Sequence, residues 1–190
     1  MSELKLENIN IQDLVDPVKE VINGKTYIIV NTSFAHSFIV KELRDIFFLY
    51  FYNNRKECQV YTEGLNVYLV EDDDVNYVIP DIVVICGDIK IKGNGYKGVP
   101  ELIVEVLSNK TRKKDKVTKF LLYERVGVKE YWIIDPKRKT AEQYVLRNGR
   151  YFLELPDIFD EEEIEEDSTI IESMVFKDMK VDFSNIFKNI

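Results

Sequence analysis

Cysteine and histidine are scarce in this chain of 190 residues, which contains two Cys and one His. Cys58 and Cys86 are far apart in sequence and His36 stands alone, which argues against a zinc site. Cys86 ends a strongly apolar run, and this position favours a small core residue over a reactive thiol. Together with the absence of an export signal, these observations predict a reduced, cytoplasmic protein.

Long apolar runs are also missing. No stretch approaches the roughly 20 residues of a membrane span. The first 16 residues are acidic and mixed, and they lack the basic start and apolar centre of a signal peptide. The hydrophobic share of 45% and aromatic share of 12% are typical of a globular protein. We therefore expect a single domain over 1–190, with an N-terminal arm at 1–16 and an acidic loop at 157–168.

An excess of positive charge is absent as well, because the net charge is −8. The distribution is uneven: residues 88–120 contain nine Lys and Arg against four Asp and Glu. Acidic residues gather instead at 71–74 (EDDD), a segment typical of a solvated loop, and in the acidic loop. Since local fields steer a polyanion, the chain could still bind nucleic acid, although weakly and with a strong dependence on salt.

The first third of the chain predicts a hairpin and a long helix. Asn23-Gly24 lies between two apolar runs within 19–30, which is the strongest short hairpin signal. Thr32 or Ser33 can cap a helix over 34–54 that is rich in aromatic residues and should pack on a sheet. His36 lies in the first turn of that helix, either as a polar residue at a helix end or at the rim of a site.

The centre of the chain predicts an interior sheet. Apolar strands are expected at 76–86, 100–107 and 129–135, and a helix over 111–126, capped by Ser108 or Asn109, joins the last two into a right-handed βαβ unit. The glycine-rich segment 87–99 is either a flap over a substrate or a flexible connector. A hairpin around Asn148-Gly149 and a short final strand and helix follow. The fold class is therefore α/β, with a central mixed β-sheet flanked by helices.

Two of these apolar strands each carry a carboxylate, Asp81 and Glu105, where an apolar residue would be expected. An ionised carboxylate is costly to bury unless something pairs with it. Glu101 lies on the same strand face as Glu105, but it is ~13 Å away along the strand and cannot reach the same ion. Asp81 and Glu105 on neighbouring strands are therefore candidate ligands for Mg²⁺ or Mn²⁺.

A basic residue near these carboxylates would complete a site for phosphodiester hydrolysis. In a Glu-x-Lys arrangement the lysine follows Glu105 by two residues, but Leu107 occupies that place. Lys119 on the following helix is the best alternative, since it shares a helical face with Asp115. A structural ion pair between Glu105 and Lys119 is the competing interpretation. The basic residues that open the helix are expected to contact nucleic acid or to be merely solvated: Lys110, Arg112, Lys113 and Lys116.

The same helix is apolar on two sides. Val117, Phe120 and Leu121 form one side, and Leu122 lies on the opposite one. A helix of this kind is covered twice, once by the sheet and once by another surface. We therefore expect a homodimer whose second subunit covers the outer side.

The segments PDIVVI (80–85) and VPELIVEVLSNKTRKKDKVTKFLLYERVGVKEYWIIDP (99–136) resemble the Uma-two (Uma2) family of restriction endonucleases, of the PD-(D/E)XK nuclease superfamily. The resemblance extends over about residues 18–187. It implies the restriction-endonuclease-like fold, Asp81 and Glu105 as metal ligands, and Lys119 as a catalytic lysine moved onto the helix. Family positions near the site are matched by His36, Asp115 and Tyr123. Departures from the family are Asn23, where Asp is common, and Asn109, where Pro is common.

Two functions remain open at this point. The first is a metal-dependent endonuclease that cuts DNA and acts as a homodimer. The second is a non-catalytic module on the same fold, which binds nucleic acid or a protein partner through its acidic loop.

Overall fold

The computed structural model describes residues 18–29, 32–54, 57–69, 76–154 and 170–190. The predicted arm at 1–16, the EDDD segment at 71–74 and the acidic loop at 157–168 lie outside these residues. Within the described part of the chain, no helix is both long enough and apolar enough to cross a membrane.

A six-stranded sheet forms the centre of the molecule, in the order β11-β10-β9-β8-β5-β3. Only β8 and β9 run parallel, and the other four neighbouring pairs are antiparallel, so the sheet is mixed as predicted. Its strands are β3 (Cys58–Thr62), β5 (Ile82–Cys86), β8 (Leu102–Val106), β9 (Glu130–Asp135), β10 (Thr140–Arg147) and β11 (Arg150–Glu154).

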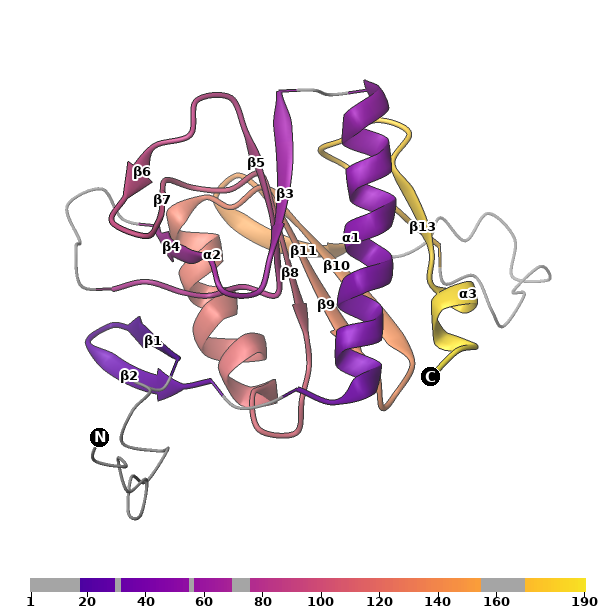
Figure 1. Cartoon of the computed structure of the whole chain (residues 1–190), viewed down its shortest axis with the longest axis horizontal. Helices are drawn as coiled ribbons and strands as arrows, with labels where there is room; N and C mark the ends of the chain where they lie inside the picture. Colours follow the sequence, from indigo (N-terminus) through magenta and orange to yellow (C-terminus); the bar gives the residue numbers. More distant parts are fainter. Residues whose placement is uncertain (1–17, 30–31, 55–56, 70–75, 155–169) are drawn as a thin grey trace, which may run out of the picture.

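Helices cover both faces of this sheet (Figure 1). Helix α1 (Phe34–Asn54) lies on one face, together with β12 (Ile170–Glu172), β13 (Lys180–Asp182) and α3 (Phe183–Phe187). The other face carries a π-helical segment, η2 (Lys114–Lys119), which continues directly into α2 (Phe120–Val126). The predicted helix is therefore present, and it joins the parallel strands β8 and β9 as a βαβ unit.

Strand alternation divides the core as the sequence predicts. On β8, Val104 and Val106 pack towards α1, whereas Ile103 belongs to the core beneath α2. Glu105 alternates with its neighbours and so falls on the α2 side of the sheet. The first central strand is shorter than expected, because β5 begins only at Ile82. Pro80 has no backbone N–H to donate to a sheet, which is consistent with a strand that starts after it.

The first hairpin is confirmed. Strands β1 (Lys19–Ile22) and β2 (Lys25–Ile28) pair across Asn23-Gly24, and both turn residues have positive φ, 51° and 73°. The following helix is capped by Ser33, whose Oγ accepts a hydrogen bond from the His36 backbone N–H at 3.2 Å. In the chain, α1 is the next helix or strand after the β1–β2 hairpin within the described residues.

The glycine-rich segment 87–99, which we expected to be a flap or a flexible connector, contains two strands. It contains β6 (Ile91–Lys92) and β7 (Gly95–Lys97), and β7 pairs in parallel with β4 (Asn66–Tyr68) in a separate three-stranded sheet. Gly95 is required by close backbone approach, because a Cβ atom there would lie 2.4 Å from the Asn66 carbonyl oxygen. Gly95 is therefore explained by close backbone packing, and it does not indicate a mobile segment.

The prediction of two reduced cysteines is wrong. Cys58 on β3 and Cys86 on β5 face each other in antiparallel register and form a disulfide. The separation of 28 residues hides this proximity in the sequence, because it becomes visible only once the register between the two strands is known. Cys86 does pack against the core beside α1, but as half of a cystine.

Candidate active site

A cavity of about 50 Å³ lies where α1 begins, β8 ends and η2 passes over the sheet. Its lining contains six ionisable residues from four segments of the chain: His36, Asp81, Glu105, Lys114, Asp115 and Lys119. The structure thus brings together the three residues predicted as catalytic and two of the three predicted as accessory. The third, Tyr123, touches this group through Glu105.

Glu105 is held at the centre of the cluster by two donors. Its side chain comes from β8, the residue is 3% exposed, and its Oε1 accepts hydrogen bonds from Lys119 Nζ at 2.7 Å and from the Tyr123 hydroxyl at 2.9 Å. Burial raises the pKa of Glu105 well above its usual value; Lys119 opposes this shift, and the nearby Asp115 and Asp81 add to it. The carboxylate is thus costly to ionise without a further cation.

Lys119 pairs with more than one carboxylate. Its Nζ lies 2.7 Å from Glu105 Oε1, 2.6 Å from Glu20 Oε1 and 3.9 Å from Asp115 Oδ1. Burial lowers the pKa of this ammonium, but the carboxylates of Glu105, Glu20 and Asp115 outweigh burial and raise it well above its usual value. An ammonium has three N–H donors, and Glu105 and Glu20 take two of them. Among the described residues, one donor is left for a water or substrate oxygen in the cavity.

Asp81 immediately precedes β5 and is fixed by the neighbouring strand. Its Oδ2 accepts hydrogen bonds from the Val106 backbone N–H at 2.7 Å and from His36 Nε2 at 3.1 Å. Val106 directly follows Glu105 on β8. Its hydrogen bond therefore holds Asp81 beside Glu105, the other candidate metal ligand. The side chain of Asp81 is 16% exposed, so it lies at the open side of the cavity.

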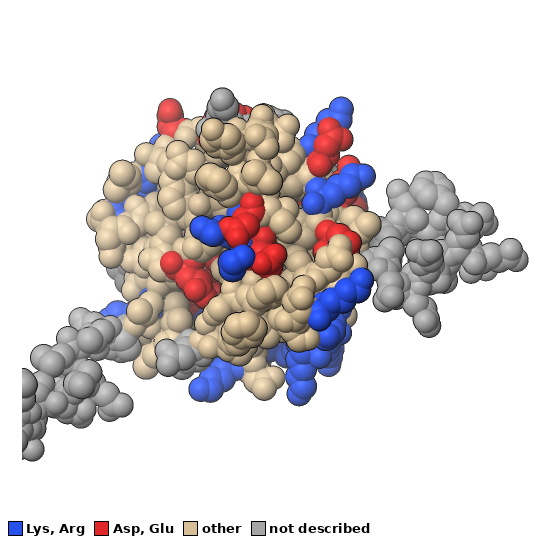
Figure 2. All heavy atoms as spheres, turned by 45° about the vertical axis from the view of Figure 1, so that its right-hand side comes forward, with Lys and Arg blue, Asp and Glu red and all other residues tan. Residues whose placement is uncertain are grey.

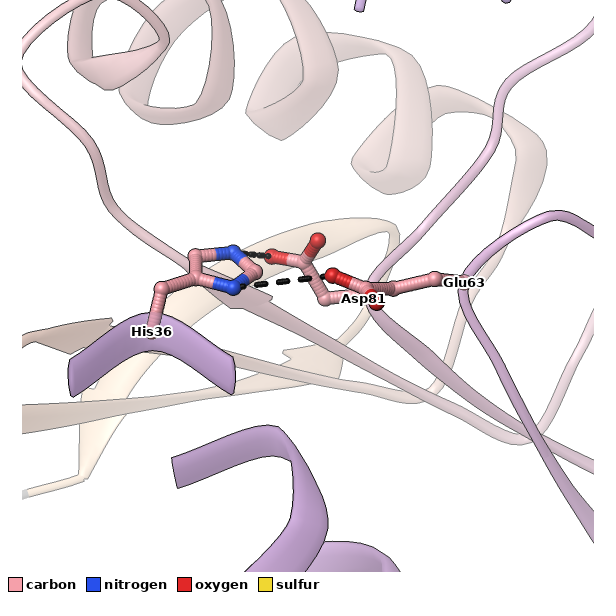
Figure 3. Close-up of side chains that lie close together, drawn as sticks. All are labelled: His36, Glu63 and Asp81. Carbon is pink, nitrogen blue, oxygen red and sulfur yellow. Dashed lines mark hydrogen bonds and ion pairs between the residues drawn. The ribbon is translucent and has the colours of Figure 1, made fainter. Parts of the chain in front are cut away.

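His36 bridges Asp81 and a residue that the sequence did not indicate. The histidine is 4% exposed, and its Nδ1 lies 3.6 Å from Glu63 Oε1 while its Nε2 faces Asp81 (Figure 3). Burial lowers the pKa of the imidazole, but the hydrogen bond to Asp81 and the charges of Asp81 and Glu63 raise it overall. Of the two interpretations of His36, the structure places it at the site.

Glu20 is a second residue that sequence reasoning missed. It is fully buried on β1, and its Oε1 accepts from the Ile79 backbone N–H at 2.8 Å, while Oε2 contacts Lys114 Nζ. Burial raises the pKa of Glu20, yet Lys119 and Lys114 together lower it overall. The available signal was alternation, because Glu20 shares a strand face with the buried Ile22.

Asp115 completes the cluster. It is 1% exposed, and among the described residues its Oδ1 has no hydrogen-bond partner. Burial raises the pKa of this carboxyl, partly offset by Lys119. With all of these groups ionised and His36 neutral, four carboxylates would face two ammonium groups and leave two negative charges in excess, which is why burial raises the pKa of Glu105 and Asp115. The carboxylates are Glu20, Asp81, Glu105 and Asp115, and the ammonium groups are Lys114 and Lys119.

The residues predicted to contact nucleic acid divide into two pairs. Arg112 Nη1 lies 2.8 Å from Asp135 Oδ2, and Lys116 Nζ lies 2.6 Å from Glu142 Oε1, so both are engaged by neighbouring carboxylates. Lys110 and Lys113 are exposed. These two are therefore better placed than Arg112 and Lys116 to meet a phosphate.

Comparison with known proteins identifies one family model and a similar solved structure. Residues 10–179 match the model of the Uma2 family, described as "Putative restriction endonuclease". A solved structure that is similar over 90% of both chains, with a TM-score of 0.68 and 20% identity, is the crystal structure of "a putative nuclease belonging to DUF820" from Anabaena variabilis. No curated protein matches the chain. The structural likeness confirms the restriction-endonuclease-like fold that the sequence predicted.

Proposed function

Because the chain belongs to the Uma2 family of restriction-endonuclease-like proteins, we propose that it is a metal-dependent endonuclease that hydrolyses phosphodiester bonds in DNA. Asp81 and Glu105 are the metal ligands in this proposal, and Lys119 is the catalytic lysine. The observation that carries the proposal is the meeting of these three residues in one largely buried cavity with an excess of negative charge.

The residues present fit a hard divalent ion. Mg²⁺ and Mn²⁺ take oxygen ligands and are held by one or two carboxylates, with waters completing the shell. Asp81 and Glu105 supply such oxygens, and the partnerless Asp115 Oδ1 can accept a hydrogen bond from a water in that shell. When bound, Mg²⁺ or Mn²⁺ supplies the Lewis acid that activates the attacking water and stabilises the leaving oxygen.

The protein's own groups prepare the reaction. The Val106 backbone N–H and His36 orient Asp81, while Lys119 and Tyr123 favour the ionised form of Glu105. The third N–H of Lys119 donates a hydrogen bond to the attacking water or to a phosphate oxygen. Burial of the ammonium strengthens this contact, since the surroundings screen charge less than bulk water does.

DNA is proposed to approach from the side of η2. The exposed Lys110 and Lys113 lie just before η2, next in sequence to the cavity-lining Thr111 and Lys114, and can bind phosphates. On the face that Figure 2 shows, basic and acidic side chains are intermixed near the centre, and a group of basic side chains lies at the lower right. Lys41 on α1, for example, pairs with Glu42 at 2.9 Å and Asp45 at 3.1 Å.

We also propose that the chain forms a homodimer. Val117 and Leu121, on the outer side of the helix, are 49% and 55% exposed, and Leu153, on the same side of the edge strand β11 as Tyr151, is 47% exposed. Such an apolar surface is typical of a protein interface. Light scattering of the wild type should give twice the 22.4 kDa mass of the chain, and Leu121→Glu should give the mass of a single chain.

Cleavage of supercoiled plasmid DNA tests the proposed activity. Wild type should cut in Mg²⁺ or Mn²⁺ and stop when EDTA is added, and Asp81→Asn should be inactive. Glu101→Gln is the control, because Glu101 immediately precedes β8, as Asp81 precedes β5, but it pairs with Lys129 at 2.6 Å and does not line the cavity. A pure preparation that cuts neither DNA nor RNA with either ion would favour the non-catalytic module instead.

A further inference from the structure

One face of the β1–β2 hairpin continues the wall of the cavity outwards. Ile29 directly follows β2 and lines the cavity, and its backbone N–H donates to the Val18 carbonyl oxygen at 2.8 Å, so the strand pairing extends to it. Tyr27 and Lys25 lie on the same strand face as Ile29, because side chains alternate. We propose that this face binds the DNA strand that flanks the cleaved bond, with Lys25 and Lys114 on its phosphates. The inference rests on the proposed endonuclease function and adds a substrate-binding surface to it.

The register of the hairpin fixes which side chains share this face. Tyr27 lies opposite Glu20, and Lys25 lies opposite Ile22. Residues directly opposite each other in an antiparallel pair point to the same side of the sheet. Glu20 and Ile22 are buried, whereas Tyr27 is half-buried and Lys25 is exposed. The face therefore has a buried half on β1, which packs on the protein, and an accessible half on β2.

Lys114 joins this hairpin face to the cavity. Its Nζ contacts Glu20 Oε2 and lies 5.8 Å from the centre of the Tyr27 ring, and its side chain, which is 12% exposed, lines the cavity. The Nζ of Lys25 lies 5.2 Å from the centre of the same ring. An ammonium group within about 6 Å of an aromatic ring is attracted to the face of that ring. Tyr27 therefore holds two ammonium groups in a row that leads out of the cavity.

The charge and the length of this row match a DNA backbone. The carboxylate of Glu20 is fully buried and paired with both Lys114 and Lys119, so its charge is already compensated. An ammonium has three N–H donors, and among the described residues Lys114 gives one of them to Glu20, which leaves donors for phosphate oxygens. Two residues along a strand advance about 7 Å, so the row from Ile29 to Lys25 spans about 13 Å. Each DNA strand carries one charge per about 3.4 Å of helix axis, so the row can face more than one phosphate.

The opposite face of the hairpin carries a lysine that serves as a control. Lys19 on β1 lies opposite Ile28 on β2, and both residues are exposed. Because neighbouring residues of a strand alternate, Lys19 points to the other side of the hairpin from Glu20. Figure 1 shows the hairpin at the lower left, apart from the six-stranded sheet. Lys19 and Lys25 are thus exposed lysines of one hairpin that differ in the face they occupy.

Fluorescence anisotropy of the full chain with a labelled DNA duplex tests the proposal, with EDTA present so that binding is measured without cleavage. Lys25→Ala should lower the slope of log affinity against log salt concentration by about one, and Lys19→Ala should leave it unchanged. Lys25→Arg keeps the charge and should keep the slope. Tyr27→Leu should weaken binding about two- to fivefold, because the ring no longer holds the two ammonium groups. Tyr27→Phe keeps the ring and should bind as wild type does.

The hairpin surface and the proposed nuclease fail in different ways. Equal slopes for Lys25→Ala and wild type would overturn the surface, as would an equal fall in Lys19→Ala or a wild type that does not bind the duplex. If plasmid DNA is cut while the slopes are equal, the nuclease stands without the hairpin surface. If the slope falls in Lys25→Ala alone while plasmid DNA is not cut with Mg²⁺ or Mn²⁺, the surface stands and the nuclease does not. Both lysines are exposed, so their variants should fold, and circular dichroism would verify this.

Discussion

Lys119 and Glu105 are 14 residues apart in the chain, yet their charged groups meet at 2.7 Å in a region where both residues are almost completely buried. A buried ion pair of this kind depends on both partners, since removing one leaves an uncompensated charge. Glu20 shares the same ammonium at 2.6 Å but also contacts Lys114, so the loss of Lys119 would leave Glu105 as the carboxylate without a cation. The pair is therefore both a structural element and a proposed catalytic one.

Lys119→Met should destabilise the protein by about 3–5 kcal/mol, because Glu105 then remains buried without a cation, while Glu20 keeps Lys114. Urea unfolding followed by the fluorescence of Trp132, the single tryptophan, would measure this change. Lys116→Met is the matched control on the same helix. Its ion pair with Glu142 is partly exposed and should contribute less than about 1 kcal/mol. A loss of under 1 kcal/mol for Lys119→Met would contradict the assignment of a buried pair.

The stability of the metal-free protein should fall as pH rises above about 4.5, the ordinary pKa of Glu105, towards the raised pKa of the folded state. Over this range the folded chain keeps a proton that the unfolded chain releases, so the free energy of unfolding decreases with pH. Glu105→Gln lacks this titration. Its stability relative to wild type should therefore improve with pH, by at most about 1.4 kcal/mol per unit. Unfolding curves in EDTA at several pH values measure the difference, and a constant difference would be the contrary result.

The Cys58–Cys86 disulfide should stabilise the protein by about 3–4 kcal/mol, because it closes a loop of 28 residues in the unfolded chain. Thiol titration of the denatured, unreduced protein should find no free thiol. Dithiothreitol should lower the urea midpoint of wild type and leave the Cys58→Ala/Cys86→Ala variant unchanged. Two free thiols before reduction would show that the bond does not form.

DNA binding should depend on the two exposed lysines that precede η2. Lys110→Ala/Lys113→Ala should lower the slope of log affinity against log salt concentration by about two, since each lysine releases about one counterion. Fluorescence anisotropy with a labelled duplex at several salt concentrations measures the slope. Lys177→Ala removes an exposed lysine beside the end of α1 and should have no effect. Equal slopes for the double variant and wild type would place the DNA elsewhere.

The contact between Glu105 and Lys119 could be predicted from the sequence, because it follows from the two-residue period of a strand and the 3.6-residue period of a helix. Alternation along β8 put Glu105 on a buried face, and the helical repeat put Lys119 on the same side as Asp115. Both elements are adjacent in the chain and joined as one βαβ unit, which leaves few possible arrangements. The fold could be predicted for the same reason, since its strands and helices have clear apolar patterns.

The remaining site residues could not be predicted because their partners are distant in sequence. Glu20 and Lys114 are separated by 94 residues, and only the packing of the β1–β2 hairpin against η2 brings them together. Glu63 lies in a turn, where no periodic pattern shows the direction of a side chain. The disulfide between Cys58 and Cys86 depends on the register of β3 against β5, which neither strand reveals alone.

Calorimetric titration with Mg²⁺ tests the central claim, that Asp81 and Glu105 hold a divalent ion in the buried cavity. Wild type and the control Glu101→Gln should bind Mg²⁺ with the same affinity, and Glu105→Gln should bind at least about tenfold more weakly. Mg²⁺ binding that is unchanged in Glu105→Gln would contradict the account, because the ion would then lie outside the cluster that Glu105 forms with Lys119.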